Sequence, residues 1–369
     1  MPTHIARIVR SGGAKEIVAA TRIGRAGPLT VDEATEVSRT ARLLMRSPHP
    51  NLAPVREVMV RDTDMLVVGA WVEGENLGEL WAAARGKGLP LPLAVALRIL
   101  LDVLSGLEAL HSVRLAVGTP AGLVHGEVIP SNVIVGTNGV TRLIHAYRIA
   151  SSWSQVPDAT RYVAPEVLMR ERGLDGRADV YSVGALLWEA MAGKPLMDGS
   201  APAAVVKRLA AGPLPAAPVP RNAAWAEPLV PLVQRALSVD RDERFADAAA
   251  MRDALHAAVG SRVAPISDVA RWVRQLAWTQ IAGRTKRFAD EPAPRVSEVD
   301  IEVVAPVPIV AIGTAPIPAA PLASPPQAAL ASPQPPPVIA RRPPAPPEPK
   351  PLELADLLEP EHEHEHEHE

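Results

Sequence analysis

A short polar loop, His125 to Asn132, constrains the fold of this chain more than any other stretch. The residues before it, 93–110, carry apolar side chains at helical spacing and predict a long amphipathic helix. The apolar run Val133 to Val135 directly after the loop predicts a short strand. A loop with a His, a carboxylate, a Pro and an Asn between two buried elements gathers polar groups where functional sites often lie. The sequence therefore predicts a functional site at this loop.

Length and composition restrict the class of protein. The 369 residues suit two domains or one large two-lobed domain with a tail, and 47% hydrophobic residues suffice for a sizeable core. A net charge of −3 supplies no basic field for nucleic acid. The absence of cysteine excludes disulfides and thiolate metal sites and fits a reducing compartment. We expect a cytoplasmic protein that binds no nucleic acid and does not act at a membrane.

The first part of the chain predicts a small sheet and one helix. Ile5–Val9 and Glu16–Ile23 are expected to be strands, joined by a turn at Gly12-Gly13. Two adjacent glycines without a third are more often a hairpin turn than a phosphate-binding loop. A helix is predicted over residues 32–45, with Thr30 or Asp32 as its N-cap.

The later part of the chain is predicted to be mostly helical. Residues 179–189 are apolar nearly all round, as in a helix buried inside a lobe. A hairpin is expected between residues 133–135 and 140–144, and further helices near 202–211, 227–237 and 246–258.

Three segments follow the last of these helices. Residues 261–290 form an amphipathic extension, with Ile266, Val269, Val273, Leu276 and Ile281 on one side, which we expect to pack on its own domain rather than on a membrane. Residues 291–360 are rich in Pro and Ala and are expected to be a disordered tail. Residues 361–369 alternate Glu and His and are interpreted as a tag or a low-complexity end.

One stretch of the tail has two interpretations. Arg341-Arg342-Pro343-Pro344-Ala345-Pro346-Pro347 places an Arg before a Pro-x-x-Pro, the form bound by aromatic-lined polyproline grooves. The other interpretation is a stiff, solvated linker, which we favour.

The polar loop resembles the catalytic loop of eukaryotic-like (Hanks-type) bacterial Ser/Thr protein kinases, His-Arg-Asp-x-x-Pro-x-Asn. Here Gly126 replaces the Arg, Glu127 the catalytic Asp, and Ile129 the Lys, while Asn132 is kept. Five further stretches resemble kinase motifs in the same order, namely residues 47–52, 66–74, 162–166, 176–184 and 240–245.

The resemblance implies an α+β, bilobal fold with a small β-rich N-lobe and a larger helical C-lobe. We expect the N-lobe and hinge over residues 1–75 and the C-lobe over residues 76–260. The N-lobe is expected to be truncated at its start and to lack the Gly-rich loop, because the matching region begins near the second strand.

The same resemblance implies that the phosphate-handling groups are altered. Thr21 stands where kinases carry the Lys that binds phosphate, and Thr40 where its Glu partner is expected. His145 stands at the metal-binding Asp of Asp-Phe-Gly. Phosphoryl transfer depends on positioning and on neutralising charge, which these groups supply in kinases.

The remaining positions of the implied nucleotide cleft are also unusual. Gly69, Ala70 and Val72 would line it, and Gly69 replaces a larger residue, either to enlarge the pocket or because packing requires a small one. Glu127 keeps a carboxylate, but its extra methylene moves that group by about an ångström, and such a misplacement can cost about 100-fold in rate. Asn132 and His145 would be the remaining metal-site positions.

The residues that hold a kinase fold together are kept. The resemblance implies a buried ion pair between Glu166 and Arg244, and an Asp179 that accepts backbone N–H bonds from the central loop.

These observations predict a pseudokinase that regulates or scaffolds bacterial signalling by binding a protein, such as an active kinase or its substrate. No cofactor is expected, although ATP or ADP without Mg²⁺ is compatible with the cleft. The alternative is a divergent Ser/Thr protein kinase with residual ATP binding or weak phosphotransfer through Glu127 and Asn132.

Overall fold

The computed structural model describes most of the first of two structural units, Met1–Ile301, and the second unit begins at Glu302. The described residues are 3–9, 15–23, 30–61, 64–89, 91–147, 159–169, 171, 173–197 and 201–290. The Gly12-Gly13 turn, the tail over residues 291–360, Arg341–Pro347 and the Glu-His end (361–369) lie outside them.

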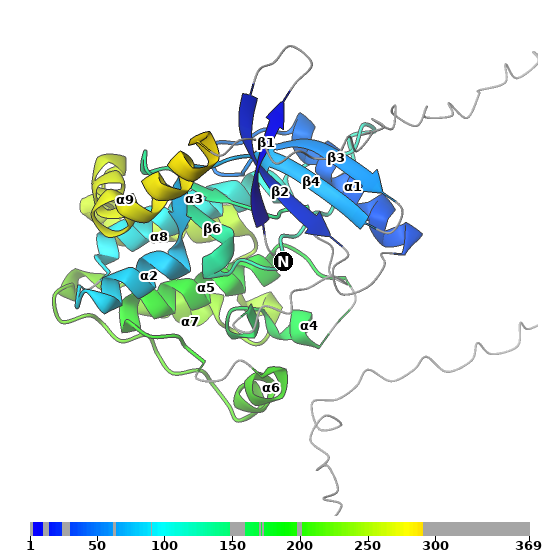
Figure 1. Cartoon of the computed structure of the whole chain (residues 1–369). Coiled ribbons are helices and arrows are strands. Elements are labelled where there is room, and N and C mark those ends of the chain that lie inside the picture. Colours follow the sequence, from blue (N-terminus) through cyan, green and yellow to red (C-terminus); the bar gives the residue numbers. More distant parts are fainter. Residues whose placement is uncertain are drawn as a thin grey trace, which may run out of the picture. The chain divides into compact units, whose positions relative to one another are not determined.

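A four-stranded antiparallel sheet forms the first part of the fold (Figure 1). Its strands are β1 (Thr3–Val9), β2 (Lys15–Ile23), β3 (Val55–Arg61) and β4 (Asp64–Ala70), in the order β1-β2-β4-β3. The register of β2 on β4 places Thr21 opposite Val67 and Ala19 opposite Gly69. This pairing brings the middle of β2 beside the strand that leads into the hinge.

Helix α1 (Val31–Arg46) packs against β3 of this sheet. Thr30 is its N-cap rather than Asp32, because the Thr30 hydroxyl accepts from the Glu33 N–H while the Glu33 carboxylate accepts from the Thr30 N–H. This capping box satisfies backbone donors that a helix start leaves open. The buried face of α1 consists of Val37, Thr40, Ala41 and Leu44.

A second, three-stranded sheet follows the hinge. It contains β5 (Gly74–Asn76), β6 (Val133–Gly136) and β7 (Thr141–Leu143) in the order β5-β6-β7, all antiparallel. The Asn76 side chain accepts from the Glu79 N–H and begins α2 (Leu77–Gly86). A Cβ at Gly74 would lie 2.4 Å from the Val135 carbonyl oxygen, so the close approach of β5 to β6 requires glycine.

The other α-helices in the described part of the chain follow α2. They are α3 (Leu93–His111), α4 (Pro165–Leu168), α5 (Arg177–Ala192), α6 (Pro202–Ala210), α7 (Leu229–Ala236), α8 (Ala248–Val259) and α9 (Ile266–Asp290). Helix α3 packs against α5 and α8, and nearly every residue of α5 is buried. The small antiparallel sheet with one helix and the larger helical part confirm the predicted α+β, two-lobed fold.

Helix α9 packs on α2 and α3 and extends to β5, β6 and β1 (Figure 1). Val269, Val273, Leu276 and Ile281 are buried as its apolar pattern predicts, whereas Ile266 is 44% exposed at the first position of the helix. Within the described ranges, no helix is both long enough and apolar enough to cross a membrane.

Candidate functional site

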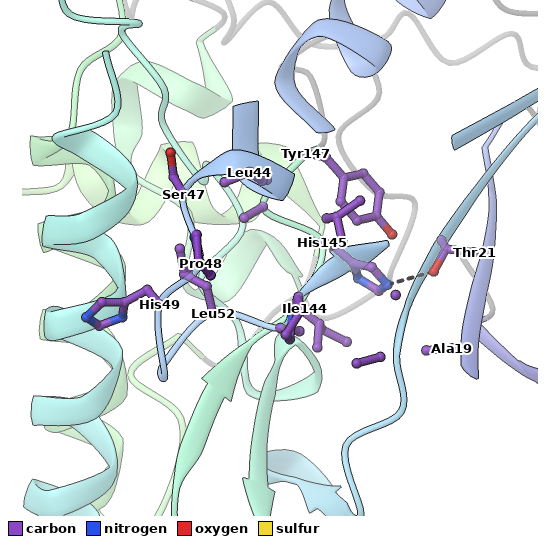
Figure 2. Close-up of a pocket in the computed structure, with 16 residues that line it drawn as sticks. Ala19, Thr21, Leu44, Ser47, Pro48, His49, Leu52, Ile144, His145 and Tyr147 are labelled. Carbon is purple, nitrogen blue, oxygen red and sulfur yellow. Dashed lines mark hydrogen bonds between the residues drawn. The ribbon is translucent and has the colours of Figure 1, made fainter. Parts of the chain in front are cut away.

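Three separate elements bring the predicted site residues together. β2 supplies Thr21, the short 3-10 turn Pro130–Asn132 before β6 supplies Asn132, and the segment after β7 supplies His145. His145 Nδ1 lies 3.1 Å from Asn132 Oδ1, and His145 Nε2 lies 3.4 Å from the Thr21 hydroxyl oxygen. Figure 2 shows the imidazole of His145 directed toward Thr21. A continuous row of hydrogen-bonded polar side chains therefore crosses the site.

The backbone at His145 is in the left-handed region, with φ of 65°. No other non-glycine residue in the described ranges has a positive φ. This conformation costs an L-residue about 1–2 kcal/mol, although His adopts it more readily than most. The His145 ring also meets Tyr147 edge to face, with centroids 6.0 Å apart. The surrounding contacts therefore hold this residue in a conformation that it would not adopt by itself.

Glu127 lies beside Asn132 but is almost entirely buried, with 2% of the residue exposed. The Asn132 side-chain amide donates to the Glu127 carbonyl oxygen over 2.9 Å and lies 3.5 Å from its carboxylate. Ile129, two residues later, is part of the hydrophobic core. Of the three loop residues that the sequence singled out, Glu127 and Asn132 lie side by side, and Ile129 packs in the core.

Thr40 lies on the inward face of α1 and is 4% exposed. Two acidic residues of this helix have other contacts, since Glu33 bonds to Thr30 and Glu36 pairs with Arg39 over 2.6 Å. The hydrogen bond from Arg39 lowers the pKa of Glu36. The inward position of α1 thus carries a hydroxyl rather than a carboxylate.

A small cavity of about 50 Å³ lies among these elements (Figure 2). Its lining includes Thr21, Leu44, Leu52, Gly69, His145 and Tyr147. Ligand sites for drug-sized molecules typically measure about 300–1,000 Å³. The cavity is smaller than that range.

The three hinge residues predicted to line the cleft line either this cavity or a second cavity of about 270 Å³. Gly69 lines the first, Val72 lines the second, and Ala70 lines both. A Cβ at Gly69 would lie 3.1 Å from the Pro54 carbonyl oxygen, which is tighter than ordinary contact. Packing against Pro54 accounts for this glycine without a ligand.

Asp179 on α5 binds the backbone of the polar loop and is completely buried. Its two carboxylate oxygens accept the N–H groups of His125 and Gly126, each over 2.8 Å. Burial acts to raise the pKa of Asp179, but the hydrogen bond from His111 and the attraction of His111 and His125 outweigh it, so that this pKa is lowered. Asp179 therefore holds the loop as a carboxylate anion.

Glu166 and Arg244 form a bidentate ion pair in the core. Arg244 Nη1 and Nη2 donate to the two carboxylate oxygens of Glu166 over 2.7 and 2.8 Å. Both side chains are buried. The two residues that the sequence analysis paired thus lie in direct contact.

Several polar partners were not predicted from the sequence. His111 Nε2 lies 2.8 Å from Asp179 Oδ2, and Arg284 of α9 pairs with the buried carboxylate of Glu75. The Tyr162 hydroxyl donates to Glu189 over 2.6 Å. A Glu at position 189, inside a mostly apolar helix, is a local signal for a buried polar partner.

Comparison with known proteins places these features in a family. A family model described as "Protein kinase domain" matches residues 9–256. Serine/threonine-protein kinase PksC of Streptomyces coelicolor is 29% identical over 245 residues, covering 63% of this chain and 42% of the relative. Tyrosine-protein kinase MasK of Myxococcus xanthus is 28% identical over 159 residues, covering 41% and 24%. Serine/threonine-protein kinase PknL of Mycobacterium tuberculosis is 34% identical over 148 residues, covering 38% and 34%. The chain spans less than half the length of each of these relatives.

Proposed function

Because the chain belongs to the protein kinase domain family, we propose that it is a pseudokinase, which keeps the family fold but does not transfer phosphate and acts by binding a protein. The observation that carries this proposal is the row Thr21, His145 and Asn132, whose polar atoms bond to one another. In the family, the corresponding positions supply a cation and the metal ligands for the nucleotide. Here the three side chains supply a hydroxyl, an imidazole and an amide.

The residues present do not fit a magnesium nucleotide. Mg²⁺ prefers carboxylate and phosphate oxygens in strict octahedral geometry, whereas imidazole suits softer metals. Asn132 Oδ1, the one amide oxygen in the row, faces the His145 ring. No cluster of three or more His, Asp or Glu side chains suited to a metal occurs in the part of the chain that the structure describes.

The framework residues support a binding role for this fold. Asp179 retains its bonds to the loop, and Glu166 retains its pair with Arg244. These buried contacts maintain a folded domain, which a binding protein needs. We propose that the partner is a bacterial signalling protein, either an active Ser/Thr kinase or its substrate. Recognition of Arg341–Pro347 by a polyproline-binding domain is a second route to a partner.

The second candidate function is a divergent Ser/Thr protein kinase, and one observation favours it. Glu127 and Asn132 are adjacent, with the amide nitrogen 3.5 Å from the carboxylate, so an acid and an amide remain together at the loop. The relatives named as Ser/Thr kinases are equally consistent with this function.

A phosphotransfer assay separates the two candidates. The full chain is incubated with radiolabelled ATP, with Mg²⁺ or Mn²⁺, and with a general protein substrate, beside a matched Glu127→Gln variant. The pseudokinase predicts equal background labelling for both proteins, including self-labelling. Labelling that the wild type shows and Glu127→Gln loses would establish the divergent kinase instead.

The binding role has its own test. The chain is added to an active bacterial Ser/Thr kinase and its substrate, and the rate of substrate phosphorylation is measured. A changed rate together with a complex in analytical ultracentrifugation is expected for a true partner. A panel of such kinases with no complex and no change in rate would count against an active kinase as the partner.

A further inference from the structure

We infer that Thr21, His145, Asn132 and the backbone carbonyl of Glu127 form a latch, a chain of hydrogen bonds that joins the small sheet to the helical part without nucleotide or metal. Thr21 belongs to β2, whereas the other members lie in the loop before β6 and the segment after β7. These contacts are present whether or not the protein transfers phosphate.

The direction of each bond in the latch follows from the chemistry of its atoms. The Glu127 carbonyl can only accept, so the nitrogen of the Asn132 amide must face it, 2.9 Å away. The amide oxygen of Asn132 then faces His145 Nδ1 and can only accept a proton from it. His145 Nδ1 therefore carries hydrogen.

The other end of the imidazole completes the chain. In a neutral ring that is protonated at Nδ1, Nε2 is an acceptor. The Thr21 hydroxyl lies 3.4 Å from Nε2 and is the donor that this tautomer requires. The latch thus runs in one direction, from the Thr21 hydroxyl through the imidazole and the amide to the carbonyl of Glu127.

Burial makes the latch more than a surface contact. Thr21, Asn132, Glu127 and His145 are all buried. A buried polar group that loses its partner is costly, so each member favours the arrangement that satisfies the others. We expect the latch to hold the two lobes in one relative position in the absence of any ligand.

The latch can be removed without removing the other connections between the lobes. The backbone also joins them where Leu143 N–H donates to Asn51 and Ala53 N–H donates to Leu143. These bonds involve no latch side chain. Variants at Thr21 and His145 should therefore stay folded while the lobes gain freedom.

Three variants separate the latch from simple packing. Thr21→Val removes the hydroxyl at nearly constant volume, and Thr21→Ser keeps it. His145→Asn tolerates the positive φ but is too short to bond on both sides, which separates backbone strain from hydrogen bonding. Losing one neutral hydrogen bond should lower the folding equilibrium constant about two- to tenfold.

The first measurement is the tautomer of His145 by ¹⁵N NMR of the full chain without nucleotide. The latch predicts a neutral ring with hydrogen on Nδ1, and Thr21→Val is expected to change the Nε2 shift while Thr21→Ser restores it. A ring with hydrogen on Nε2 alone would overturn the inference.

The second measurement follows the lobes themselves. The chain has no cysteine, so Arg42→Cys on α1 and Ser261→Cys after α8 can carry spin labels uniquely. The latch predicts a narrow distance distribution for the wild type that broadens in Thr21→Val and His145→Asn but not in Thr21→Ser. Equal distributions in all four proteins would overturn the latch.

Discussion

Replacing Arg244 with leucine should destabilise this protein more than almost any other single change. All five N–H groups of the Arg244 guanidinium have acceptors within 3.2 Å, two on Glu166 and three on the carbonyls of Arg177, Ser238 and Val239. The guanidinium carbon also lies 5.1 Å from the centroid of the Tyr181 ring. The side chain thus satisfies one buried charge and three carbonyl groups at once.

The magnitude follows from what Arg244→Leu leaves behind. The Glu166 carboxylate would remain buried without its counter-ion, and breaking such a pair by removing one partner costs about 3–5 kcal/mol. At roughly 2–4 °C per kcal/mol for a domain of this size, the melting temperature should fall by about 6–20 °C. Differential scanning fluorimetry of the full chain measures this directly.

Two further variants test the cause rather than the size of the effect. Adding Glu166→Gln to Arg244→Leu removes the stranded charge and should recover part of the loss. Arg271→Leu, whose pair with Asp268 is mostly exposed, should change little, because surface pairs contribute about 0–1 kcal/mol. An Arg244→Leu protein as stable as Arg271→Leu would refute the reasoning, and failure of Glu166→Gln to recover stability would show that stranded charge is not the cause.

Three other predictions concern groups outside that pair. Burial raises the pKa of Asp102, so the ionised carboxylate destabilises the fold increasingly as pH rises above about 4. Asp102→Asn should therefore raise the melting temperature at pH 7 and have less effect at pH 4. The pKa of Asp179 is lowered, so its contribution to folding stability is present above about pH 4 and is lost as pH falls through its folded pKa. Asp179→Asn should lower the melting temperature at pH 7 and make the melting temperature fall less steeply as the solution is acidified. Arg284→Gln removes the partner of the buried Glu75 and should speed amide hydrogen exchange in α9 near its end, and unchanged exchange there would contradict a role for that pair.

The spacing of apolar residues and the residues at helix ends were enough to predict several helices from the sequence. The spacing of apolar residues over 93–110 predicted α3, which the structure places at Leu93–His111. The sequence predicted Thr30 or Asp32 as the N-cap of α1. In the structure the N-cap is Thr30, because Glu33 completes the capping box. Local chemistry of this kind depends on neighbours a few residues apart, which a sequence displays.

Contacts between distant residues were not predictable in the same way. His111 and Asp179 are 68 residues apart, and Glu75 and Arg284 are 209 apart, so no spacing or periodicity links either pair. The hydrogen bond between Thr21 and His145 likewise requires the register of β2 and the turn after β7. The resemblance to kinases named both residues, but only tertiary structure shows that they bond to each other.

Thermal unfolding of residues 1–290 with ATP or ADP, with and without Mg²⁺ or Mn²⁺, tests the central claim most directly. A ligand at 100 times its dissociation constant stabilises a protein by about 2.7 kcal/mol, which a melting curve resolves. If the protein is a pseudokinase whose metal ligands have been replaced, nucleotide should leave the melting temperature unchanged or shift it equally with and without metal. A shift that requires the metal would contradict the account, because it would place a working metal site at Asn132 and His145.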